Sequence, residues 1–131
     1  MRLYRPVGIA ELRLIAKSSF REFPSRLPEQ PIFHPVLTLE YARRIARDWN
    51  TVDAQSGYAG FVTRFEIDDE TAKRYPVQIA GGRSHEELWV PAKELQDFNS
   101  RIVGVIGIVE AFTGPKFSGT LDPESLLPAD L

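Results

Sequence analysis

Three adjacent ionisable side chains, His85, Glu86 and Glu87, stand directly before an apolar stretch in the segment GGRSHEELWVP. The apolar residues are typical of a strand, and neighbouring side chains of a strand point to opposite faces. Glu87 therefore shares one face with His85 and Trp89, while Glu86 belongs to the other face. A carboxylate beside an apolar surface can stabilise a developing cation, and a histidine next to it can orient a substrate. The alternative is a solvated strand end without a chemical role.

Arg5 is a second candidate, at the end of the short strand-forming stretch RLYR. The planar guanidinium group binds a phosphate or a carboxylate through two parallel hydrogen bonds. The alternative is a structural ion pair with an acidic side chain of the protein.

A proline-rich segment precedes a third group of candidates. Four prolines fall within residues 21–35, which predicts an extended loop. The loop carries Arg21, Arg26 and His34, and long loops inside compact domains are often functional.

Sequence periodicity predicts the elements that must position these residues. Helices are expected within residues 8–20 and 38–49, the second with Thr38 as its N-cap. Its apolar stripe includes Trp49, and Tyr41 and Trp49 are expected in the core. Strands are expected at residues 2–5, 58–67, 76–80, 86–90 and 102–112. Two early helices followed by strands with little helix between them predict an α+β fold with a mostly antiparallel sheet. A single domain is expected at residues 1–112, followed by a proline-containing acidic tail at residues 113–131.

Composition excludes several classes of function. The 131 residues include no cysteine and two histidines, which argues against disulfides, a cysteine nucleophile and a metal site. The net charge of −2 argues against binding to a nucleic acid backbone. No apolar run of membrane-spanning length and no signal peptide is visible. The expected protein is soluble and cytoplasmic, although an effector exported by another route would have the same features.

The order of these features resembles the small ADP-ribosyltransferase-like domains of bacterial toxins. The resemblance covers residues 2–112. It is carried by YR at the first strand and then by PIFHPVLTLEYARRIA, FVTRFEI, the GG turn, EELWVP and IVGVIGIVEAF. It implies a split, mostly antiparallel sheet with two helices in the N-terminal half, and NAD as the substrate.

The resemblance also implies roles for individual residues. Arg5 would hold the nicotinamide side of NAD, and Phe33 or His34 would stand where the family has a serine or tyrosine. Glu87 matches the catalytic glutamate, which binds the nicotinamide ribose and stabilises the oxocarbenium-like state as nicotinamide leaves. His85 replaces a second acidic residue of the arginine-modifying members, so an arginine acceptor is not implied. His85 or Glu86 would position the acceptor.

Two functions follow as expectations. The first is an NAD-dependent mono-ADP-ribosyltransferase or NAD glycohydrolase, acting as a toxin or effector on an unidentified protein. It predicts a cleft on which Arg5 and Glu87 converge. The second is a non-catalytic protein-binding or immunity-type module on a similar fold, with the proline-rich loop and the tail as interaction surfaces. It predicts a closed salt bridge between Arg5 and Glu87 with no adjoining pocket.

Overall fold

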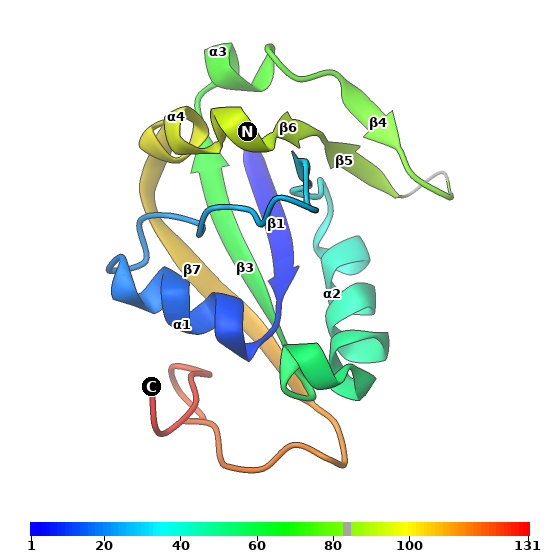
Figure 1. The fold of residues 1–131 in the computed structure, drawn as a ribbon, viewed down its shortest axis with the longest axis vertical. Coiled ribbons are helices and arrows are strands. Elements are labelled where there is room, and N and C mark those ends of the chain that lie inside the picture. The colour runs from blue at the N-terminus through cyan, green and yellow to red at the C-terminus, as the bar shows by residue number, and fades with distance from the viewer. Residues whose placement is uncertain (83–84) are drawn as a thin grey trace.

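A three-stranded antiparallel sheet with strand order β1–β3–β7 forms the centre of the molecule (Figure 1). The structure is a computed structural model that describes residues 1–82 and 85–131. The strands are β1 (Arg2–Val7), β3 (Ala59–Ile67) and β7 (Ile102–Thr113). Seven of the nine residues of β3 are buried, as expected for a central strand with neighbours on both sides. The three strands predicted for these segments are confirmed.

Backbone bridges continue this sheet beyond β1. Val36 pairs with Tyr4 of β1 on one side and with Glu87 on the other. Glu87 lies in β5 (Glu86–Leu88), which pairs antiparallel with β4 (Val77–Ile79). Glu87 is therefore held between two neighbouring segments of backbone.

A second, two-stranded sheet pairs β2 (Ile32–Phe33) with β6 (Val90–Pro91). The single strand predicted at residues 86–90 is therefore wrong, because the chain is divided at Trp89 between two sheets. Val90 leaves the line of β5 to pair with Phe33, and both side chains are fully buried.

The described residues contain four α-helices, so the fold is α+β with mostly antiparallel sheets. The two longer ones are α1 (Ile9–Lys17) and α2 (Leu39–Asp48), and the short ones are α3 (Asp69–Ala72) and α4 (Leu95–Ser100).

The two longer helices cover opposite faces of the sheet. Leu12 of α1 belongs to the same buried cluster as Leu3 and Phe61. Ala46 of α2 packs with Val62, whose side chain points to the other face because it follows Phe61 in β3.

An aromatic cluster anchors the proline-rich loop to the core. The ring of Phe23 lies 5.1 Å from that of Phe33 and 4.9 Å from that of Phe65, between centroids. The backbone N–H and C=O groups of Phe23 both bond to the buried side-chain amide of Asn99. The loop after α1 therefore starts from a fixed point before it crosses in front of β1 (Figure 1).

Two local expectations are corrected. Pro6 does not end the first strand, because beyond Tyr4 only one side of β1 is paired and a proline without an N–H is tolerated there. Trp49 is 57% exposed and does not belong to the core. Helix α2 ends at Asp48, and the ring of Trp49 lies on the surface.

Residues of the predicted tail pack against the domain. Phe117, Leu121 and Leu127 are partly buried against the main hydrophobic cluster. Among the residues described, no helix has the length and hydropathy needed to cross a membrane.

Candidate functional site

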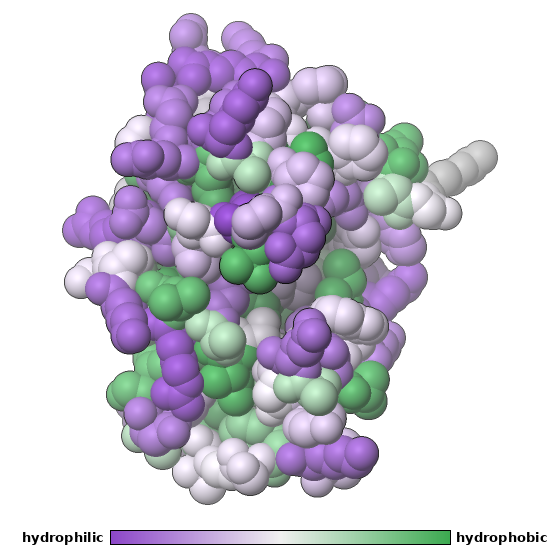
Figure 2. All heavy atoms as spheres, in the orientation of Figure 1, coloured by the Kyte–Doolittle hydropathy of each residue, from purple (hydrophilic) through white to green (hydrophobic). Residues whose placement is uncertain are grey.

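A cavity of about 520 Å³ opens beside the second half of β1, a volume suited to a small-molecule ligand. It opens there because Val36 pairs with β1 only at Tyr4, so Arg5 and Pro6 have no strand on that side. The other walls come from the start of α1, the proline-rich loop, the end of α2 and Glu87 of β5. The face drawn in Figure 2 is hollowed near its middle.

A second hollow, of about 560 Å³, lies between the loop and α4, where Phe23, Lys93 and Gln96 are among its lining residues. None of the predicted site residues lines it, whereas Arg5, His34 and Glu87 all line the first cavity. The first cavity is therefore the candidate site.

Glu87 is held at both of its carboxylate oxygens. Its carboxylate Oε2 accepts a hydrogen bond of 2.5 Å from the hydroxyl of Tyr41. Its Oε1 accepts one of 2.9 Å from the indole N–H of Trp89 and lies 3.3 Å from Nδ1 of His34. The residue is 8% exposed. These contacts fix the position of both oxygens while one edge of the group still reaches the cavity.

Three segments of chain bring these partners together. The pairing of Val36 with Glu87 places His34 two residues from the point of contact. Thr38 caps the start of α2 by accepting a hydrogen bond from the backbone N–H of Tyr41, which fixes the first turn of the helix. Tyr41 therefore projects from a well-defined helix end onto the carboxylate.

The hydrogen bonds keep Glu87 ionised in spite of its burial. Burial by itself raises the pKa of Glu87, but the bonds from Tyr41, Trp89 and His34 outweigh it and bring the pKa below the ordinary value of 4.5. Burial and the bond to Glu87 also raise the pKa of Tyr41 above its usual range, so the phenol keeps its proton. At neutral pH the site therefore holds a fixed negative charge.

Arg5 lines the cavity, but its guanidinium group is already engaged. Nε and one terminal nitrogen bond to the two carboxylate oxygens of Glu11, at 2.6 and 3.0 Å. The ring of Phe33 lies behind it, 4.8 Å from the guanidinium carbon. The salt bridge between Arg5 and Glu87 that would characterise a closed, non-catalytic module is not formed.

Phe33 is not part of the cavity lining. Its side chain is fully buried in the aromatic core, and its ring packs against the guanidinium group of Arg5. His34, its neighbour in sequence, lines the cavity instead, with 43% of its side chain exposed.

The structure places His85 and Glu86 outside the cavity lining. The imidazole of His85 stacks on Tyr41, with centroids 4.5 Å apart and planes 12° apart, and Nε2 lies 3.5 Å from Arg44. His85 thus packs against Tyr41, and Tyr41 in turn holds Glu87. Glu86 follows the alternation of the strand and faces away from Glu87.

Tyr41 and the indole of Trp89 hold the carboxylate of Glu87, and the sequence did not identify them as its partners. Tyr41 was expected in the core, and 46 residues separate it from Glu87. Nothing in the local pattern connects them. For the contact between Trp89 and Glu87, the sequence contains one signal: strand alternation places both side chains on the same face.

Metals and known relatives add no further constraint. Within residues 1–82 and 85–131, no three histidine or acidic side chains lie together in a way that would hold a metal ion. No family model, curated protein or solved structure matches the chain. The functional argument therefore rests on the geometry of the cavity.

Proposed function

We propose that the protein cleaves the bond between nicotinamide and ribose in NAD, as an NAD glycohydrolase or mono-ADP-ribosyltransferase of the ADP-ribosyltransferase-like type. The observation that supports this most directly is Glu87, a nearly buried yet ionised carboxylate held by three neighbours on the wall of the cavity.

The chemistry requires such a group. As the C–N bond breaks, its electron pair leaves with nicotinamide and positive charge develops on the ribose ring. A fixed carboxylate in a water-poor site stabilises that charge without reorganising during the reaction. A water molecule or an acceptor side chain then forms the new bond to the ribose carbon and loses its proton. If the acceptor is a protein of another cell, the same reaction makes the chain a toxin or effector.

The alternative of a non-catalytic binding module is less well supported. It required Arg5 and Glu87 to close on each other with no pocket between them. Arg5 pairs with Glu11 instead, and a cavity adjoins both Arg5 and Glu87.

Nicotinamide release from NAD tests the proposal. We expect release by the wild-type protein and a loss on the order of 10²- to 10³-fold in E87Q, because the amide carries no charge to offset that of the ribose. E70Q, at an exposed position of α3, is the matched control and should retain the wild-type rate. Equal release by wild type and E87Q, or none by the wild type, would refute the proposal.

The products distinguish NAD hydrolysis from ADP-ribose transfer. Free ADP-ribose equal in amount to the nicotinamide indicates hydrolysis. ADP-ribose attached to added protein indicates transfer.

A further inference from the structure

Arg26 is a cation of the cavity lining. It projects from the proline-rich loop and lines the cavity together with Arg5 and Glu87. Within the described part of the chain its Nε is buried and has no hydrogen-bond partner, and none of the ion pairs there includes Arg26.

The backbone around Arg26 is held on both sides. Phe23, three residues before it, is bonded through its N–H and C=O groups to Asn99. After it, the N–H of Leu27 donates to the side-chain oxygen of Gln30, and the N–H of Gln30 donates to the C=O of Leu27. The guanidinium group is therefore presented by an ordered turn.

Arg26 competes with Arg5 for one nearby carboxylate. Arg5 bonds to both carboxylate oxygens of Glu11, and the other acidic residues of the lining are Asp53 and Glu87. Burial, and next the charge of Arg5, lower the pKa of Arg26, with Glu11 acting in the opposite direction. A partly buried guanidinium without an ion-pair partner is costly to the protein, and an anion bound in the cavity beside Arg26 would offset that cost.

We propose that Arg26 forms an anion subsite for a phosphate or diphosphate group of the molecule that occupies the cavity. Phosphate oxygens accept the parallel hydrogen bonds that a guanidinium offers. Applied to NAD the inference rests on the proposed function, because the diphosphate joins the nicotinamide ribose to the rest of the molecule. Because Arg5 is already paired with Glu11, we assign to Arg26 the anion-binding role that the sequence predicts for Arg5.

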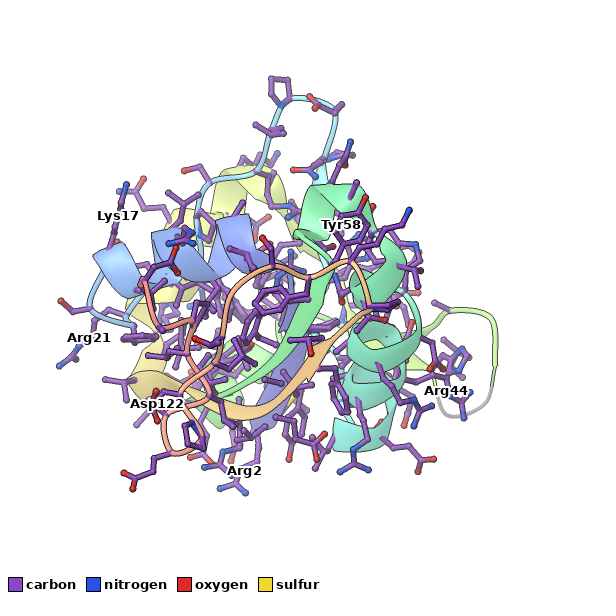
Figure 3. The ribbon with its side chains drawn as sticks, turned by 90° about the horizontal axis from the view of Figure 1, so that it is seen from below. Arg2, Lys17, Arg21, Arg44, Tyr58 and Asp122 are labelled. Atoms are coloured by element: carbon purple, nitrogen blue, oxygen red, sulfur yellow. The ribbon has the colours of Figure 1, made fainter. Side chains whose placement is uncertain are left out.

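Binding of inorganic pyrophosphate to the full chain, measured by calorimetry, tests the subsite without requiring turnover. We expect the wild type to bind pyrophosphate, and R26Q to bind it about 10- to 100-fold more weakly, as for loss of a charged hydrogen bond. R21Q is the matched control, because Arg21 belongs to the same loop but its side chain points away from the body of the protein in Figure 3. R21Q should bind as the wild type does.

Two further ligands identify the anion. Tighter binding of ADP-ribose than of pyrophosphate, with both weakened in R26Q, assigns the subsite to a nucleotide diphosphate. Equal affinity for orthophosphate and pyrophosphate, again lost in R26Q, assigns it to a single phosphate group. Thermal unfolding without ligand provides the folding control, and R26Q should be at least as stable as the wild type because an uncompensated cation has been removed.

Unchanged pyrophosphate affinity in folded R26Q, or no binding by the wild type, would overturn the subsite. The outcome is independent of the proposed reaction. Nicotinamide release with no role for Arg26 would refute the subsite alone, whereas Arg26-dependent pyrophosphate binding without nicotinamide release would refute the reaction alone.

Discussion

Glu87 combines burial with ionisation, two properties that oppose each other in an isolated carboxyl group. The donors that resolve the conflict come from the loop before α2, from α2 itself and from the chain just after β5. A charge held in this way changes little in position while a reaction proceeds. This is the property that stabilisation of a cationic transition state demands.

Removal of the Tyr41 hydroxyl should move the pH dependence of the reaction. The bond from Tyr41 lowers the pKa of Glu87, so Y41F raises that pKa and the carboxylate becomes protonated at higher pH. We expect the acid limb of the pH profile for nicotinamide release to shift upward in Y41F. Y58F, at a tyrosine outside the cavity lining, should leave the limb in place, and a coincident limb in Y41F and wild type would contradict this role.

The same linkage affects stability. Because the pKa of Glu87 in the folded protein lies below the ordinary 4.5, its contribution to the free energy of unfolding is present above pH 4.5 and is lost as the pH falls through the folded value. Y41F should therefore cost on the order of 1–3 kcal/mol at pH 7. The cost should shrink on acidification, as measured by urea unfolding of both proteins at several pH values.

At the residue scale, the sequence pattern placed Glu87 on the same strand face as Trp89 but did not reveal its contacts with Tyr41 and His34. Strand alternation was enough to separate Glu87 from Glu86. The neighbours Phe33 and His34 were not separated, although their side chains have different environments, because the sequence does not show which one faces the core. Tyr41 could not be connected to Glu87 because their contact depends on how α2 is placed against β5.

At the element scale, the close approach of α2 to β3 positions Tyr41. A Cβ atom on Gly60 of β3 would lie 2.5 Å from the backbone oxygen of Ala46 and 2.8 Å from its Cα. These are backbone atoms of α2, so a larger residue at this position must displace the whole helix. Gly60 thus sets the distance between the helix and the sheet.

G60A should therefore destabilise the protein by about 1–3 kcal/mol through overpacking, and should also weaken nicotinamide release by displacing Tyr41. G107A in β7 is the matched control, since the nearest atom to its Cβ would be 3.9 Å away. Thermal unfolding and nicotinamide release measure the two effects. Similar melting temperatures for the two variants would show that α2 does not depend on this contact.

The main strands and both early helices could be predicted because their apolar periodicity is long and regular. The division of residues 86–90 into β5 and β6 could not, because it depends on two distant segments. Val36 pairs with Glu87, while Phe33 draws Val90 into a second sheet. The apolar pattern of residues 86–90 would be the same for one continuous strand as for two strands in different sheets.

At the scale of the whole molecule, residues beyond 112 pack against the core. The sequence pattern predicts that the domain ends at residue 112. Removal of residues 114–131 would expose the core surface now covered by Phe117, Leu121 and Leu127. Each partly buried side chain contributes about 1 kcal/mol, so we expect a loss of roughly 3 kcal/mol, measured by chemical unfolding. D130N removes only the exposed ion pair with Arg13 and should change stability little. Equal stability of the truncated and full chains would contradict this packing.

We propose that NAD binds in this cavity and is cleaved with the help of Glu87. The most direct measurement is a calorimetric titration of NAD into wild type and E87Q, with nicotinamide quantified in the same samples afterwards. We expect binding to both proteins and free nicotinamide from the wild type only. No binding at millimolar NAD, or equal nicotinamide from both proteins, would contradict it.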